Sequence, residues 1–215
     1  MINHFKTIIF DCDGVILNSN KVKKIAYFKV TSSYYGDKCA KSLIEYLEKN
    51  TGKPREHFFT HFFNNIVPSD SVGPNVEELI KEVGEEIHKG LMECEISQSL
   101  FTLRDNSPET NWIVVSGGVQ SELRDIFTNR SLVDLFDGGI FGGPMTKDEI
   151  LKSLFKNDSI KLPAIYLGDS KFDFEVSSRF NLDFLFISEW TNFKDWKNYC
   201  YNNNISSVKS LAALL

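Results

Sequence analysis

The sequence lacks a basic surplus, a long apolar run and paired cysteines, and each absence removes a class of function. Lysine and arginine total 24 against 29 acidic residues, a net charge of −5, which disfavours binding to nucleic acid or to an anionic membrane. No apolar segment reaches the roughly 20 residues of a membrane-spanning helix. The first apolar run is too short for a secretory signal and is interrupted by Asp11 and Asp13. We therefore expect a cytoplasmic protein.

The four cysteines are scattered without any C-x-x-C spacing: Cys12, Cys39, Cys94 and Cys200. This pattern excludes a disulfide framework and a thiolate zinc site as organising features. Cys12 lies between two acids on an apolar run, where we expect a small core residue and not a nucleophile. The sequence carries no signal for oligomeric state.

What the chain does contain is enough apolar residues, 42% of 215, for one full core and a smaller module. Short runs rich in Ile, Val and Phe predict buried strands at 6–10, 112–116, 139–141, 164–168 and 184–188. Helical spacing follows at 119–127 and at 147–155. This alternation predicts an α/β fold with a Rossmann-like, doubly wound parallel sheet.

The first two predicted strands are about a hundred residues apart, far more than a crossover helix needs. We therefore predict a core of residues 1–17 and 95–215, with a helical module at 18–94 inserted after the first strand. Helical patterns in the module cover 22–34, 40–48, 56–63 and 76–92, with breaks that include Gly36, Gly52 and Pro54.

The first predicted strand ends in Asp11-Cys12-Asp13-Gly14. Side chains two apart on a strand point to the same side, so the two carboxylates would project together. They would repel each other unless a cation compensates. Mg²⁺ suits such oxygen ligands where phosphate completes its coordination. An ordinary turn explains this stretch equally well when it is taken alone.

Polar residues also end the second and fourth predicted strands. Ser116 and Gly117 offer a hydroxyl and a backbone N–H just ahead of a helix, whose N-terminus favours anions. Asp169 directly follows the fourth run, and Asp173 comes four residues later. Each motif alone is also typical of a polar turn, but right-handed crossovers would bring all of them to one edge of the sheet.

Lys147 follows Thr146, which with Glu149 forms a Thr-x-x-Glu capping box. Lys147 would therefore lie in the first turn of a helix, where a cation is electrostatically misplaced. Its ammonium makes more sense if it points toward clustered carboxylates or a phosphate, although an exposed lysine tolerated at small cost remains the alternative.

The order of these motifs resembles the haloacid dehalogenase (HAD) superfamily. The matching stretches are DCDGV at 11–15, VVSGG at 114–118, Lys147 and GDSKFD at 168–173, and they frame nearly the whole core. The resemblance implies a Rossmann-like core, and it identifies the helical module as a C1-type cap. Asn18 stands where many capped phosphatases carry aspartate, which affects the hinge into the cap more than the chemistry.

In that family the resemblance makes Asp11 the nucleophile and Asp13 the acid and base. It implies Mg²⁺ held by the Asp11 carboxylate, the Asp13 backbone carbonyl and Asp169, with Asp173 assisting or orienting Lys147. Three residues would bind the substrate phosphate: Ser116, Gly117 and Lys147.

The presence of Asp13 favours phosphatases and phosphomutases over dehalogenases, which need no leaving-group acid. The leading hypothesis is a Mg²⁺-dependent phosphoric monoester hydrolase that acts on a small phosphorylated metabolite, with a sugar phosphate favoured. One alternative is a phosphomutase of the β-phosphoglucomutase type, and another is a non-catalytic metabolite-binding module.

His57 and His61 stand four residues apart, a spacing that can bind metal on one helix face. They lie among phenylalanines and lack the glutamate of a zinc-protease motif, so we expect them to pack inside the helical module. Lining a pocket of that module is the second possibility for either histidine.

Overall fold

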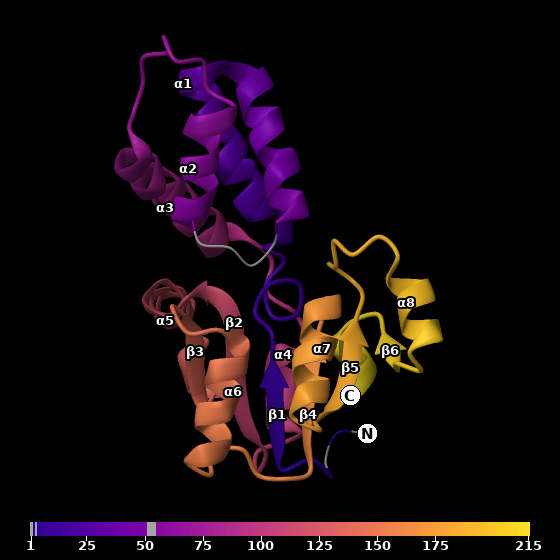
Figure 1. Ribbon diagram of the computed structural model, residues 1–215. Helices are drawn as coiled ribbons and strands as arrows, with labels where there is room; N and C mark the ends of the chain where they lie inside the picture. Colours follow the sequence, from indigo (N-terminus) through magenta and orange to yellow (C-terminus); the bar gives the residue numbers. More distant parts are fainter. Residues whose placement is uncertain (1, 3, 51–54) are drawn as a thin grey trace. The chain divides into compact units, whose positions relative to one another are not determined.

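The computed structural model describes residues 2, 4–50 and 55–215. The chain divides into two compact units, one of Met1–Asn20 with Cys94–Leu215 and one of Lys21–Glu93. The first is an α/β unit and the second is helical (Figure 1). Among the described residues, none of the helices combines the length and apolar character needed to cross a membrane.

The α/β unit is built on a six-stranded parallel sheet in the order β3-β2-β1-β4-β5-β6. The strands are β1 (Thr7–Phe10), β2 (Asn111–Val119), β3 (Gly139–Gly143), β4 (Ala164–Gly168), β5 (Asp183–Ile187) and β6 (Ser207–Val208). The doubly wound α/β fold predicted from the sequence is confirmed. Strand β6 was not predicted, because two residues carry no readable pattern.

Both faces of the sheet are covered, which is why its central strands are continuously apolar. On one face, α6 (Lys147–Lys156) and α7 (Lys171–Arg179) pack on residues such as Ile9 and Tyr166 (Figure 1). On the other face, the rings of Phe10 and Trp112 contact Phe136, which in turn packs on Phe127 of α5 (Gln120–Asn129). The remaining elements are α4 (Leu100–Asp105), α8 (Trp196–Asn202) and the 3₁₀ turns Val133–Leu135 and Leu211–Leu214.

The helical unit consists of α1 (Asn20–Lys49), α2 (Arg55–Asn65) and α3 (Val76–Glu93). Helix α1 runs through both segments predicted at 22–34 and 40–48, but Gly36 interrupts it with a φ of 78°. Glycine adopts this left-handed conformation without the Cβ clash that other residues meet. The predicted break at Gly52 and Pro54 lies outside the described residues.

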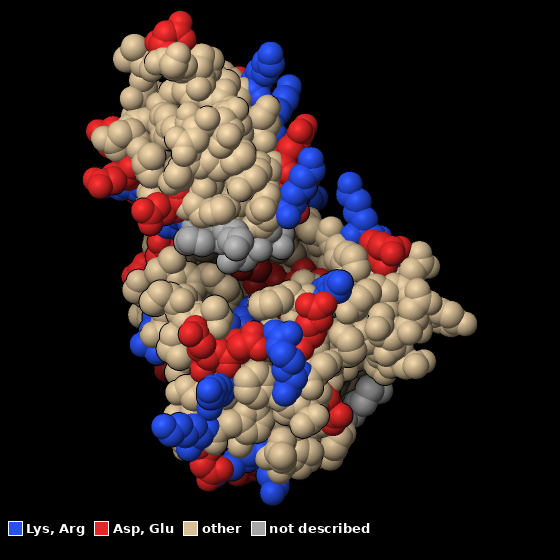
Figure 2. All heavy atoms as spheres, viewed as in Figure 1, with Lys and Arg blue, Asp and Glu red and all other residues tan. Residues whose placement is uncertain are grey.

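Charged side chains of both signs mix over the surface of the α/β unit. On the face that Figure 2 shows, acidic and basic residues are interspersed and do not gather into one basic surface. An example is the bidentate pair of Arg179 with Asp148, whose N–O distances are 2.6 and 2.8 Å. This pair joins α7 to α6 on the outside of the sheet.

Candidate active site

The carboxyl ends of three adjacent strands carry the candidate residues of the core. In the parallel register, Phe10 of β1 lies beside Val114 of β2 and Leu167 of β4. Asp11 therefore comes one residue beyond the central strand, while Asp169 follows β4 directly. Both residues are buried, with exposed fractions of 6% and 5%. The sheet topology thus brings together acids that are 158 residues apart in the sequence.

Lys147 connects this edge to the helix that covers it. The capping box of Thr146 and Glu149 forms as predicted and starts α6 at Lys147. The ammonium Nζ lies 2.8 Å from Asp11 Oδ1 and 2.6 Å from Asp173 Oδ1, with only 7% of the side chain exposed. The prediction that this misplaced cation points to clustered carboxylates is therefore confirmed. The alternative of an exposed lysine is wrong.

Asp173 uses both of its oxygens within the protein. Its Oδ1 accepts from Lys147 and lies 3.3 Å from the Tyr166 hydroxyl. Its Oδ2 accepts from the backbone N–H of Ser170 at 3.2 Å and from the Ser170 hydroxyl, as part of a capping box that starts α7. With its acceptors already engaged, Asp173 is suited to orienting Lys147.

Asp13 is placed by a turn. Strand β1 ends at Phe10, so alternation along a strand does not determine where this side chain points. Instead the chain turns at Gly14, whose φ is 82°, and Asp13 forms a β-bridge with Leu17. The Ser19 hydroxyl then donates to Asp13 Oδ1 at 2.5 Å. A half-buried carboxylate is thus held by a short local loop.

Ser116 and Gly117 occupy the same edge. Ser116 is fully buried near the end of β2, and its hydroxyl oxygen accepts a hydrogen bond from the Gly118 N–H at 3.0 Å. Gly117 is exposed. The register with β3 shifts between Val115 and Val119, so these residues lie where the regular pairing is interrupted. Where the pairing is interrupted in this way, the end of the strand can form a loop.

The acidic cluster carries more negative charge than Lys147 can balance. One carboxylate oxygen from each of Asp11, Asp169 and Asp173 lies within 4.8 Å of the others. Burial, then the Asp173 charge, raises the pKa of Asp11 to about 7 although Lys147 opposes the shift. Burial and the Asp11 charge raise the pKa of Asp169 well above its ordinary value. Burial alone would lower the pKa of Lys147, but Asp11 and Asp173 hold it well above the usual range.

This donor set fits a divalent cation. Buried carboxylate oxygens are the ligands that Mg²⁺ uses, and the cation would offset the carboxylate repulsion that adds to burial in raising both pKa values. Both carboxylate oxygens of Asp173 already accept hydrogen bonds within the protein. The carboxylates suited to hold the metal are therefore those of Asp11 and Asp169.

Several contributors were not singled out from the sequence: Ser19, Asn20, Tyr166 and Ser170. Ser170 was detectable, since Ser170-x-x-Asp173 is itself a capping pattern that predicts the start of a helix. Tyr166 is a hydroxyl within an apolar strand, and its hydroxyl donates to the Val115 carbonyl at 3.1 Å beneath Lys147. That partner is 51 residues away in the sequence, so no local signal identifies it.

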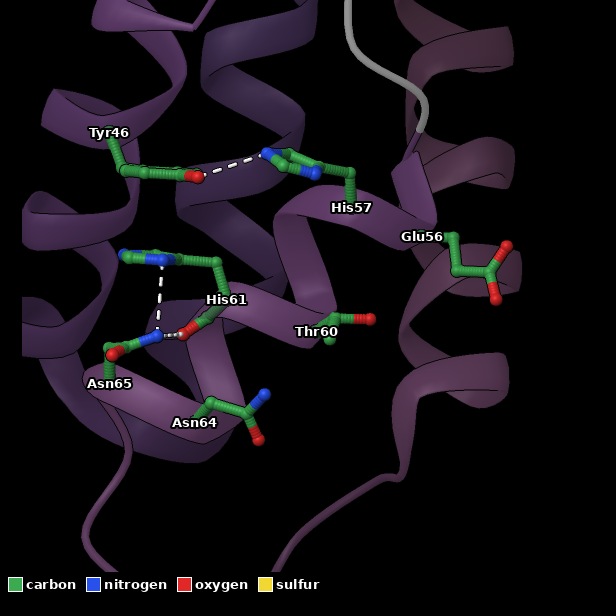
Figure 3. Close-up of a pocket in the computed structure, with 7 residues that line it drawn as sticks. All are labelled: Tyr46, Glu56, His57, Thr60, His61, Asn64 and Asn65. Atoms are coloured by element: carbon green, nitrogen blue, oxygen red, sulfur yellow. Dashed lines mark hydrogen bonds between the residues drawn. The ribbon is translucent and has the colours of Figure 1, made fainter.

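The two histidines of the helical unit lie at its surface. A shallow pocket of about 470 Å³ lies between α1 and α2 (Figure 3). The His57 ring bonds the Tyr46 hydroxyl at 2.9 Å, and the His61 ring stacks on Tyr46 with centroids 3.5 Å apart. The prediction that both histidines pack inside is wrong for His57, which is exposed. The phenylalanines around them do form core: Phe58, Phe59 and Phe62 are buried.

Comparison with known proteins shows the family. Residues 8–187 match the model of the haloacid dehalogenase-like hydrolases, and the chain belongs to this family. A comparison with curated proteins found no match for the chain.

Solved structures share the fold along the whole chain. A haloacid dehalogenase-like family hydrolase from Streptococcus pneumoniae has a TM-score of 0.68 at 20% identity, covering 98% of this chain and 97% of its own. A HAD hydrolase of family IA, variant 3, from Entamoeba histolytica scores 0.74 at 11% identity, covering 97% and 94%. CbbY from Rhodobacter sphaeroides, in complex with xylulose-1,5-bisphosphate, scores 0.71 at 13% identity, covering 97% and 95%. At these identities the likeness concerns the fold.

Proposed function

We propose that this chain is a Mg²⁺-dependent phosphatase that hydrolyses a small phosphorylated metabolite through an aspartyl-phosphate on Asp11. The observation that carries the proposal is the buried Asp11 carboxylate, held by Lys147 at the central strand end and facing Asp169 across the cluster. Phosphoryl transfer needs chiefly positioning and neutralisation of charge, and this arrangement can supply both.

In the proposed reaction, a carboxylate oxygen of Asp11 attacks phosphorus while the bond to the leaving oxygen breaks. The Cys12 N–H and the Lys147 ammonium both contact Asp11 Oδ1, at 2.8 Å each. Together these two donors hold the carboxylate in a fixed orientation for the attack. Asp13 gives its proton to the leaving oxygen. It then takes a proton from the water that cleaves the acyl phosphate and releases inorganic phosphate.

The phosphoryl oxygens would be received by the Ser116 hydroxyl, the Gly117 N–H and Lys147. Helix α5 begins just beyond them at Gln120, and its N-terminus favours negative charge. When bound to Asp11, the Asp13 carbonyl and Asp169, Mg²⁺ would offset the charge of the phosphate and of the attacking carboxylate.

We assign the helical segment 18–94 as a cap that selects the substrate, with the catalytic core in 1–17 and 95–215. A sugar phosphate is the favoured class, supported by the CbbY neighbour, which binds a sugar bisphosphate. The same similarity supports the phosphomutase alternative, since such an enzyme would use the same residues to return the phosphoryl group to a sugar.

The test is release of inorganic phosphate from p-nitrophenyl phosphate and from a panel of sugar phosphates, with Mg²⁺ or with EDTA. We expect turnover that EDTA abolishes and that added Mg²⁺ restores, because Lys147 alone does not balance the charge of the ionised acidic cluster and the phosphate once the metal is removed. Isomer formation without phosphate release would favour the mutase. A folded protein that is inert toward the whole panel would support the non-catalytic alternative.

Asp13→Asn should slow hydrolysis most for substrates with poor leaving groups, because only these need a proton as the bond breaks. We expect a loss on the order of 10²-fold or more for an alkyl phosphate and a clearly smaller loss for p-nitrophenyl phosphate. The measurement is kcat/KM for the two esters in wild type and variant. Equal losses for both would contradict the acid role of Asp13.

A further inference from the structure

Asn20 is a residue to which neither the motifs nor the proposed chemistry assigns a task. It is the first residue of α1 and belongs to the α/β unit. Its side-chain amide Nδ2 donates to Asp169 Oδ2 at 2.7 Å and to the Trp190 carbonyl at 2.8 Å. Its own carbonyl accepts from Asn192 Nδ2 at 3.3 Å. Asn20 therefore joins a carboxylate of the acidic cluster to the loop after β5.

Asp169 accepts hydrogen bonds through both its backbone carbonyl and its carboxylate. Its backbone carbonyl accepts from the Thr191 hydroxyl at 2.5 Å. Its Oδ2 faces Asn20 and lies so close to Gly14 that a Cβ on that glycine would come within 2.2 Å of it. Within the part of the chain that the structure describes, no donor contacts the other carboxylate oxygen, Oδ1. The carboxylate is thus fixed through one oxygen and has the other available.

The preference for particular residues at a helix start does not account for this contact. The preference for serine, aspartate and asparagine applies to the N-cap, which is Ser19 because α1 begins at Asn20. Of these three, asparagine alone supplies an amide that can donate to two acceptors, whereas aspartate would place another carboxylate beside Asp169. The amide is therefore matched to the carboxylate it contacts.

We propose that Asn20 is a positioning residue for the metal site, because its amide orients Asp169 so that the second oxygen of that carboxylate can bind Mg²⁺. This inference rests on the proposed function. Hydrogen-bond partners of metal ligands commonly set metal affinity, and their loss costs about 10- to 100-fold.

The test is calorimetric titration of the metal-free protein with Mg²⁺ in the absence of substrate. Asn20→Ala and Asn20→Ser should both raise the Mg²⁺ dissociation constant about 10-fold or more. Serine keeps a small polar side chain at this position, so agreement between the two variants excludes an effect of the apolar replacement alone. Asn192→Ala is the matched control: it removes a side-chain bond of the same junction that does not involve Asp169, and should stay within about twofold of wild type.

Steady-state kinetics supply a second readout that a merely structural residue would not move. The Mg²⁺ concentration for half-maximal turnover of p-nitrophenyl phosphate should rise in parallel with the dissociation constant, and excess Mg²⁺ should restore most of kcat. Asn20 variants that bind Mg²⁺ as wild type does, or an Asn192→Ala protein that is weakened equally, would overturn the inference alone. A wild-type protein that binds no Mg²⁺ would overturn the proposed function as well.

Discussion

Asp11→Asn is expected to lower turnover of p-nitrophenyl phosphate by about 10⁴-fold or more, because it removes the nucleophile and leaves the shape of the site unchanged. The same substitution should not destabilise the metal-free protein. It removes a buried carboxylate whose pKa is raised to about 7, first by burial and then by the charge of Asp173, while Lys147 keeps its contact with Asp173 at 2.6 Å.

The two effects of Asp11→Asn therefore have opposite signs, and thermal unfolding in EDTA alongside the activity assay measures both. Asp105→Asn, at an exposed position on α4, is the control for simple removal of a negative charge and should retain activity. Substantial turnover in Asp11→Asn would exclude this residue as the nucleophile. A large loss of stability would mean that its carboxylate contributes favourably to folding.

Lys147→Met is expected to damage stability and activity together. Removing one partner of a buried ion pair leaves charge without compensation, at a cost of about 3–5 kcal/mol in the free energy of unfolding. Here Lys147 serves both Asp11 and Asp173. Loss of a cation from the phosphoryl site should also reduce kcat by on the order of 10²- to 10³-fold. Chemical denaturation and phosphate release are the two measurements.

Lys152→Met tests the same chemical change at an exposed position of the same helix, and should alter stability by about 0.5 kcal/mol or less. If Lys147→Met were as mild as this control, the ion pairs at the strand edge would be energetically unimportant. We do not expect Lys147→Arg to behave as wild type, because a planar guanidinium does not replace a compact ammonium between two carboxylates.

The sheet and the main site motifs could be predicted because their signals are local. Buried strands read as apolar runs, and the polar residue that ends each run falls on the same edge once the strands are parallel. Lys147 was placed by the conflict between its charge and the helix N-terminus, a conflict that clustered carboxylates or a phosphate would resolve. The structure supplies that acid in Asp11 and Asp173.

What the sequence did not reveal depends on contacts between distant segments. Asn20 meets Asp169 across 149 positions, and no periodicity or motif connects the two. Asp13 was predicted by alternation along a strand that in fact ends at Phe10, so its position follows from the Gly14 turn and the Ser19 hydroxyl. His57 was expected inside because its neighbours are phenylalanines, but the helix turns those rings inward and the imidazole outward.

The charge of the acidic cluster has a kinetic consequence. Once ionised, the three carboxylates outnumber the one ammonium that faces them, so an arriving phosphate dianion would meet net repulsion unless a divalent cation is already in place. Binding should then follow a compulsory order, with metal first and ester second. The negative charge of the cluster would then prevent the substrate from binding until Mg²⁺ is bound.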